Sequence, residues 1–443
     1  MSNSIQRVSF AFLIAFGILS LALGLWSIAS PGLIDRDDNP RLFFDEEKIQ
    51  RGTILDRADR ILAETIPLSG TLIRHYPDRS SAPIVGYYSI NFGQSEIEEA
   101  LNETLRGPYG FLDRLLHRDR VGRSVRLTID AAIQRKLADQ FDQPGGAIVL
   151  SIPDGAIIAT ASYPSFDPNT LDENWKALSS DPASPLLNRA TQGLFQPGAI
   201  FETPLLADAI EHGWATLTQT LTNAAQPLAL SNLVLSCTQT GSGPTLGEAY
   251  SNACPGPFAD LGATLGETEL LSIAQRWHLD TPPALEIRTS AALTSTSKLT
   301  STETLHAFAV GQGQLTVSPL QMALVAATIG NRGYLPAPYI VQDIQSIDGE
   351  WIPFQAANRS STAIVSSSTA QTILSAMRSI DNTAGHSGLA YSGAKQLAWF
   401  IGLAPADRPE YAIAVLIELR SGQSTDRAEE IGRALLIDLI NNR

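Results

Sequence analysis

Residues 10–29 are mostly apolar and contain no charged side chain, which strongly limits what the chain can fold into. A helix needs about 20 consecutive apolar residues to cross the hydrocarbon core of a membrane, and this run is long enough. Trp26 suits the membrane interface, where aromatic side chains are enriched. The sequence therefore predicts a transmembrane anchor over residues 9–30.

The charges on either side of the anchor predict its orientation. Arg7 and the terminal amine precede it, whereas three of the four charged residues at positions 35–38 are aspartates. Positive charge stays in the cytoplasm, so we expect residues 1–8 inside and the remainder outside. A cleaved signal peptide is the alternative, with residues 27–29 as a small-x-small cleavage site. The apolar core exceeds the roughly 7 to 15 residues of a signal peptide, which favours an anchor.

Length and composition limit the classes that remain. A chain of 443 residues predicts two or three domains, and 44% hydrophobic residues is typical of a folded protein. The net charge of −14 argues against nucleic acid as a partner, because phosphates need a basic surface. The six histidines are scattered and no phosphate-binding glycine loop occurs, so we expect neither a metal nor a cofactor.

Cys237 and Cys254 are the two cysteines of the chain. Outside the cytoplasm such a pair can form a disulfide, which would stabilise the fold by roughly 3 kcal/mol in the chain-entropy model. Two buried free thiols are the alternative, and the sequence alone does not separate the two.

Local patterns divide the part outside the membrane into residues 31–143 and 144–443. The first part shows short strands near Ile54 and Leu62, and helical spacing over residues 94–105 and 131–141. The second part opens with two β-branched runs around residues 153–155, a hairpin signal. A second hairpin is predicted from residues 397–403 and 411–419, and an amphipathic helix from residues 424–441. An antiparallel sheet covered by helices makes an α+β fold.

The segment P-G-A-I-F-E, from Pro197 to Glu202, is the most informative motif. With the residues from Asn188 onward, it resembles the start of the active-site helix of penicillin-binding proteins, which reads P-G-S-x-x-K. Side chains three apart share a helix face, so the lysine can take the proton of the serine that attacks the substrate. Ala199 and Glu202 stand at those two positions.

Other segments carry the same resemblance over residues 41–442. R-G-x-I-x-D-R-x-x-x-x-L-A, beginning at Arg51, is similar to the first box of class B members, in the non-catalytic pedestal of the short type. Residues 145–169 resemble the first core hairpin of the family, and residues 309–323 resemble a turn into a buried helix. The resemblance implies a serine-transpeptidase-like domain with an inserted helical subdomain, a pedestal of residues 31–143 and one transmembrane helix.

Two more family motifs can be placed by counting from landmarks. The S-x-N motif falls on Ala253 and Pro255, counted back from the F-x-x-L-G pattern that begins at Phe258. The K-T-G motif is predicted at Tyr391, Ser392 and Gly393, just before the A-W-F segment at Ala398. At none of these positions does the sequence keep the reactive residue of the family.

These substitutions predict a protein that is not an enzyme and has no catalytic residues. By analogy with class B relatives, we expect it in the bacterial plasma membrane, as a scaffold or regulator of peptidoglycan synthesis beside a multi-pass glycan polymerase. One alternative is a module that binds the peptidoglycan stem peptide without forming a covalent bond. Another is a D,D-transpeptidase that uses other residues. Lys395 shares a strand face with Gly393 and Tyr391 toward the cleft, but a solvated surface position is favoured for it.

Overall fold

A computed structural model describes most of the chain. The described residues are 2–29, 49–68, 70–108, 113, 116, 120–222, 224–231, 233–239, 243–292, 298–354, 359–420 and 423–441.

The N-terminal helix α1, Ser2–Ala29, contains the predicted anchor. Its segment Ile5–Trp26 has a mean hydropathy of 2.4, and none of the side chains in it is buried. Among the described residues it is the one helix both long and apolar enough to cross a membrane. The structure thus supports a single-pass anchor.

The pedestal is built on a mixed six-stranded sheet with the order β13-β12-β6-β1-β2-β3. Strands β12 and β13 come from residues 341–353, within the sequence of the second domain, and β12 pairs antiparallel with β6. The predicted boundary at residue 143 therefore does not separate the sheets, because the pedestal sheet takes two strands from later in the chain. The strands are β1 Ile54–Leu55, β2 Ile61–Leu68, β3 Thr71–His75, β6 Val125–Leu127, β12 Val341–Gln345 and β13 Trp351–Pro353.

Short helices and strands cover this sheet and connect it to the second domain. The predicted helix at residues 94–105 is two short helices, and the one at 131–141 is present as α8. The elements are η1 Arg79–Ser81, α4 Ala82–Val85, β4 Tyr88–Ser89, β5 Gly93–Gln94, α5 Glu96–Ala100, α6 Asn102–Arg106 and α8 Ala131–Ala138.

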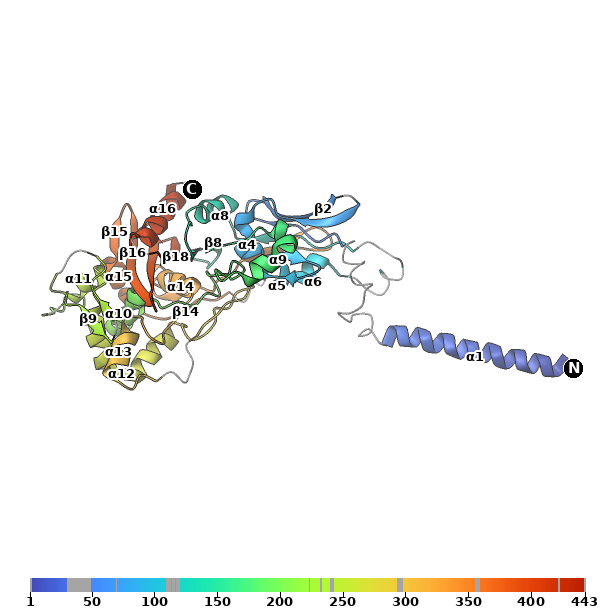
Figure 1. Cartoon of the computed structure of the whole chain (residues 1–443), viewed down its shortest axis with the longest axis horizontal. Helices are drawn as coiled ribbons and strands as arrows, with labels where there is room; N and C mark the ends of the chain where they lie inside the picture. Colours follow the sequence, from blue (N-terminus) through green and yellow to red (C-terminus); the bar gives the residue numbers. More distant parts are fainter. Residues whose placement is uncertain are drawn as a thin grey trace.

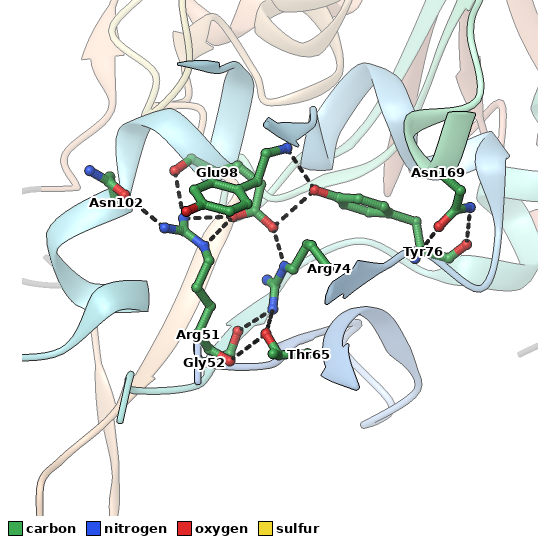
Figure 2. Close-up of polar contacts among 9 residues, drawn as sticks. Arg51, Gly52, Thr65, Arg74, Tyr76, Glu98, Asn102 and Asn169 are labelled. Atoms are coloured by element: carbon green, nitrogen blue, oxygen red, sulfur yellow. Dashed lines mark hydrogen bonds and ion pairs between the residues drawn. The ribbon is translucent and has the colours of Figure 1, made fainter. Parts of the chain in front are cut away.

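A buried ion cluster holds the pedestal together (Figure 2). The Glu98 carboxylate accepts hydrogen bonds from Arg51 Nη2 at 2.7 Å and from Arg74 Nε at 2.6 Å. Burial alone would raise the pKa of Glu98, but the charges of Arg74 and Arg51 outweigh it, and the pKa is lowered. Arg51 also lies over the ring of Tyr88, 4.1 Å from its centroid. The cluster joins the segment before β1, strand β3 and helix α5.

The second domain has a six-stranded antiparallel sheet with the order β15-β16-β17-β18-β7-β8. Both predicted hairpins are confirmed: β7 pairs with β8, and β17 with β18. Helices α8 and α16 pack on one face of the sheet, and α14 packs on the other (Figure 1). The elements are β7 Gly145–Ser151, β8 Ile157–Tyr163, α14 Pro319–Gly330, β15 Arg378–Ile380, β16 Thr383–Ser392, β17 Lys395–Ala404, β18 Tyr411–Leu419 and α16 Arg427–Asn441.

A helical subdomain lies between the first and last strands of this sheet in the sequence, as the resemblance implied. Helix α12 contacts α10 and α13, and it bends at Gly266, where φ is 77°. Its main elements are η3 Gly198–Phe201, α10 Glu202–Glu211, β9 Leu228–Leu230, β10 Leu233–Leu235, α11 Leu246–Ser251, α12 Pro255–Arg276 and α13 Thr302–Ala309. The smaller remaining elements are η2 Pro168–Thr170, α9 Leu171–Ser180, β11 Tyr334–Leu335, β14 Thr362–Ala363 and α15 Ser367–Ala376.

Candidate active site

Ala199 lies in the single turn of 3-10 helix η3, immediately before α10 begins at Glu202. Gly198 makes this turn possible, since its φ is 57° and a Cβ there would lie 2.1 Å from the carbonyl oxygen of Leu389. The glycine of the P-G-A-I-F-E motif therefore brings the turn against strand β16. The chain keeps the glycine of the motif at a position whose backbone requires it, although the reactive side chains of the motif are replaced.

A narrow cleft of about 30 Å³, partly open to solvent, brings together motif positions that are far apart in the sequence. The first-motif positions Ala199 and Glu202 line it, and so do the second-motif positions Ala253 and Pro255. Tyr391 lines it as well. The full lining is Ala199, Glu202, Leu235, Ser236, Thr238, Ala253, Pro255, Val310, Leu389 and Tyr391.

The predicted position of the third motif is wrong. Ser392 and Gly393 do not line the cleft; both are exposed, and Gly393 has a φ of 61° at the turn between β16 and β17. The residues opposite Ala199 are His386 to Gly388: a Cβ on Gly388 would lie 2.7 Å from the Cβ of Ala199. The prediction failed because it counted back from Ala398 and assumed a short connection, whereas β16 and β17 form a hairpin of ten-residue strands.

The sequence does contain a signal for the corrected position. His386, Ser387 and Gly388 keep the K-T-G spacing, with serine for threonine and the glycine unchanged. Gly388 is needed where the strand passes close to η3. The Ser387 hydroxyl donates to Glu429 Oε2 of α16 at 2.5 Å. Histidine thus stands where the resemblance places the lysine.

Glu202 and His386 form a buried polar pair behind Ala199. Glu202 is fully buried, and neither carboxyl oxygen has a hydrogen-bond partner among the described residues. Burial raises the pKa of Glu202 well above its usual value, so the carboxyl is held in its protonated form. His386 Nε2 lies 3.7 Å from Glu202 Oε2.

His386 is held in place by hydrogen bonding and stacking. Its Nε2 donates to the carbonyl oxygen of Ala199 at 3.1 Å, since a carbonyl oxygen can only accept. Its ring stacks on Tyr250 with 4.2 Å between centroids, and the Tyr250 hydroxyl lies 2.8 Å from Thr203 Oγ1. Burial lowers the pKa of His386 to about 4, against the opposing effects of the Ala199 hydrogen bond and the charge of Glu429. The imidazole is therefore neutral near pH 7.

The cleft wall offers hydroxyl groups but no basic side chain. Ser236, Thr238 and Tyr391 carry the hydroxyls, and none of the described lining residues is a lysine, an arginine or a histidine. Lys395, for which the sequence favours a solvated surface position, is 68% exposed and pairs with Glu418 at 2.7 Å. It is a surface lysine.

A disulfide holds one wall of the cleft. Cys237 is bonded to Cys254, with an S–S distance of 2.09 Å. Ser236 and Thr238 flank the first cysteine, and Ala253 and Pro255 flank the second, and all four line the cleft. Within the part of the chain that the structure describes, no cluster of three or more His, Cys, Asp or Glu side chains could hold a metal.

Comparison with known proteins identifies the family. Residues 145–436 match the model of the penicillin-binding protein transpeptidase domain, and residues 51–119 match that of the penicillin-binding protein A dimerisation domain. The chain belongs to the penicillin-binding proteins. Its two matched domains and anchor helix are those of a class B penicillin-binding protein.

Relatives of this penicillin-binding protein match over almost its whole length. The peptidoglycan D,D-transpeptidase PbpA of Mycolicibacterium smegmatis is 31% identical over 98% of this chain and 96% of its own. The imipenem acyl-enzyme complex of penicillin-binding protein A from M. tuberculosis has a TM-score of 0.79 and 30% identity, covering 89% of this chain and 99% of the other. A D,D-transpeptidase domain from Eggerthella lenta has a TM-score of 0.76 and 25% identity, covering 89% of this chain and all of the other.

These comparisons overturn the expectation that this penicillin-binding protein is not an enzyme. Relatives that cover nearly all of the chain are named as transpeptidases, and one of the similar structures is an acyl-enzyme. The loss of the family's serine and lysine predicted the loss of all catalysis. What the substitutions at Ala199 and Glu202 do establish is narrower: any acylated group in this chain is not at position 199, because a methyl group cannot attack a carbonyl.

Proposed function

We propose that this penicillin-binding protein acts in peptidoglycan synthesis as a D,D-transpeptidase that takes the stem peptide into the cleft beside Ala199. The relatives that match almost the whole chain are named for this reaction. The observation that carries the proposal is the convergence of the three motif positions. The positions of the first and second motifs line one cleft. His386, at the lysine position of the third motif, contacts Ala199 directly.

The reaction requires a nucleophile from outside the first motif. Transpeptidation by this family passes through a covalent acyl-enzyme: a hydroxyl oxygen forms an ester with the carbonyl of the penultimate D-Ala, the amide bond to the terminal D-Ala breaks, and the hydroxyl proton passes to the amine that leaves. The described cleft offers such groups on Ser236, Thr238 and Tyr391. Ser236 and Thr238 flank the disulfide-bonded Cys237, so their backbone is fixed against the wall that carries Ala253. We assign the acylated residue to one of these three.

Binding and acylation are tested separately on the full chain in detergent micelles. Calorimetry with a stem pentapeptide ending in D-Ala-D-Ala should give saturable binding. Ser236→Trp should weaken that binding at least about tenfold, because an indole there fills the cleft. Val234→Trp is the matched control, since Val234 is exposed and two residues away but does not line the cleft. Absence of peptide binding would overturn the proposal.

Acylation is followed by intact mass after incubation with a fluorescent penicillin, and the label is mapped by peptide digestion. Label on Ser236, Thr238 or Tyr391 assigns the nucleophile. Peptide binding without any covalent label would show that the protein is not a transpeptidase and that it binds the stem peptide non-covalently.

We further infer that α1 anchors the protein in the bacterial plasma membrane, with residues 1–8 in the cytoplasm and the cleft outside. The charge asymmetry around α1 supports this orientation. Beside the membrane, the pedestal and anchor hold a multi-pass glycan polymerase, so that the protein also organises the synthetic complex. The retained pedestal supports this role, because it matches a family model although the motif residues of the cleft are replaced.

A further inference from the structure

We infer that the cleft selects a peptide whose C-terminal end is uncharged, with an amide in place of the free carboxylate. The inference rests on the proposed function, because it names the chemistry of the peptide end that the cleft receives. It follows from the charges of the cleft wall, from the two buried groups behind Ala199 and from the partners of the basic side chains nearby.

The described wall of the cleft has no positive charge to balance a carboxylate. Its titratable side chains are Glu202 and Tyr391, and neither can become a cation. A carboxylate that leaves water for such a site loses its hydration without gaining a charged partner. An amide has no net charge and loses much less.

The groups behind Ala199 do not supply a cation either. Glu202 stands at the first-motif lysine position and His386 at the third-motif lysine position, so both expected ammonium groups are replaced. His386 is 2% exposed and donates its Nε2 proton to Ala199. Glu202 is neutral while protonated, and losing the proton would place a negative charge beside the cleft. Neither state supplies a positive charge for an anionic ligand.

Basic side chains near the cleft are engaged by other groups. Lys395 pairs with Glu418 at 2.7 Å, and Arg189 lies 3.7 Å from the same carboxylate. Arg378 contacts a residue next to the wall: its Nη1 donates to Gln239 Oε1 at 2.6 Å, one residue beyond Thr238. If the cleft binds a carboxylate instead, Arg378 is therefore the side chain that would pair with it.

Neutral hydrogen-bonding groups are present for an amide. The hydroxyls of Ser236 and Thr238 can each donate and accept. Gln312 does not line the cleft: it is 4% exposed, and its Oε1 accepts from the backbone N–H of the lining residue Tyr391 at 3.3 Å. An amide offers both a carbonyl oxygen and N–H groups to the hydroxyls of Ser236 and Thr238.

The test compares two stem peptides that differ only at the last group, D-Ala-D-Ala with a free acid and D-Ala-D-Ala amide. Calorimetry on the full wild-type chain should show the amide binding at least about tenfold more tightly. Tighter binding of the free acid overturns the inference while leaving the proposed function intact. Failure of both peptides to bind a folded chain overturns the proposed function, and this inference with it.

Two variants test whether the charge of the cleft wall sets the preference for the amide. Tyr391→Lys places a cation on the wall and should reduce the preference for the amide at least about fivefold. Ala394→Lys adds the same charge at an exposed position of the same hairpin, outside the cleft lining, and should leave the ratio unchanged. Equal effects of the two variants on the ratio of the two affinities would show that the charge of the cleft wall does not set the preference, and the inference would be wrong. If the free acid is preferred and Arg378→Gln abolishes that preference, Arg378 is the carboxylate anchor and the inference is wrong.

Discussion

His386 Nε2 lies 3.1 Å from the carbonyl oxygen of Ala199 and 3.7 Å from Glu202 Oε2, so one imidazole connects both ends of the first motif. All three residues are buried. The imidazole and the carboxyl occupy the positions where the resemblance places two lysines. The family's cationic site has become a neutral, desolvated one.

The first prediction concerns Glu202 and pH. The unfolded chain releases this proton near a pKa of about 4.5, whereas the folded chain retains it, so the free energy of unfolding falls as pH rises above that value. Glu202→Gln removes this dependence. We expect the variant to match the wild type near pH 5 and to exceed it by about 1 to 3 kcal/mol near pH 8, measured by urea unfolding.

The control for that measurement is Glu173→Gln, which changes an exposed carboxylate of α9. A change below about 0.5 kcal/mol is expected at both pH values. If Glu202→Gln loses stability relative to the wild type as pH rises, Glu202 is ionised and paired in the folded protein.

The second prediction concerns His386. Its folded pKa of about 4 lies below the unfolded value of 6.5, so the stability it contributes is present above pH 6.5 and is lost as pH falls toward 4. NMR on histidine-labelled protein should show its ring Cε1–H signal unchanged from about pH 8 to about pH 5.5. In urea the same signal should titrate near 6.5. A midpoint above about 6 in the folded state would show that the ring is charged or solvated.

The third prediction tests the corrected position of the third motif. Gly388→Ala should destabilise the protein by about 1 to 3 kcal/mol, because the new methyl group would lie 2.7 Å from the Cβ of Ala199. Ala199→Gly removes the group it collides with, so the double variant should recover much of the loss. Additive effects in the urea-unfolding cycle would mean that the two positions do not touch.

The fourth prediction concerns the buried cluster of Figure 2. Glu98→Gln leaves Arg51 and Arg74 buried without their counter-charge and should cost about 3 to 5 kcal/mol. Glu99→Gln is the matched control, since the neighbouring Glu99 pairs with Arg288, which is 72% exposed, and should cost less than about 1 kcal/mol. Limited proteolysis of the pedestal measures the stability of both variants, since a less stable pedestal is cleaved faster. Equal cleavage rates for the two variants would show that the cluster is not needed for pedestal stability.

The fifth prediction concerns assembly. Exchanging residues 9–30 for an unrelated membrane anchor should reduce copurification of a multi-pass glycan polymerase, because helix pairing in lipid depends on the side chains that face the partner. Ser236→Trp, which blocks the cleft, should leave the association unchanged. The opposite pattern would place the function of the protein in peptide binding rather than in assembly.

The sequence alone determined the features that depend on local spacing. The uncharged apolar run predicted α1, because a membrane-spanning helix needs a long run without charges. The β-branched runs around residues 153–155 predicted the β7–β8 hairpin, because buried strands are continuous apolar runs bounded by turn residues. Ala199 and Glu202 both line the cleft, because i and i+3 positions remain adjacent across the turn from η3 into α10. Ala253 and Pro255 followed from a nearby landmark and also line the cleft.

Tertiary structure decided what depends on pairing between distant segments. The register of β16 against η3, which places His386 rather than Tyr391 behind Ala199, is fixed by nine paired positions with β17 and by the close approach of Gly388. The pedestal sheet recruits β12 from more than 200 residues beyond β6, as the pairing of Val341 with Leu127 shows. Local patterns specify which residues are buried but not which distant residues they meet, and that choice is made by packing and strand register.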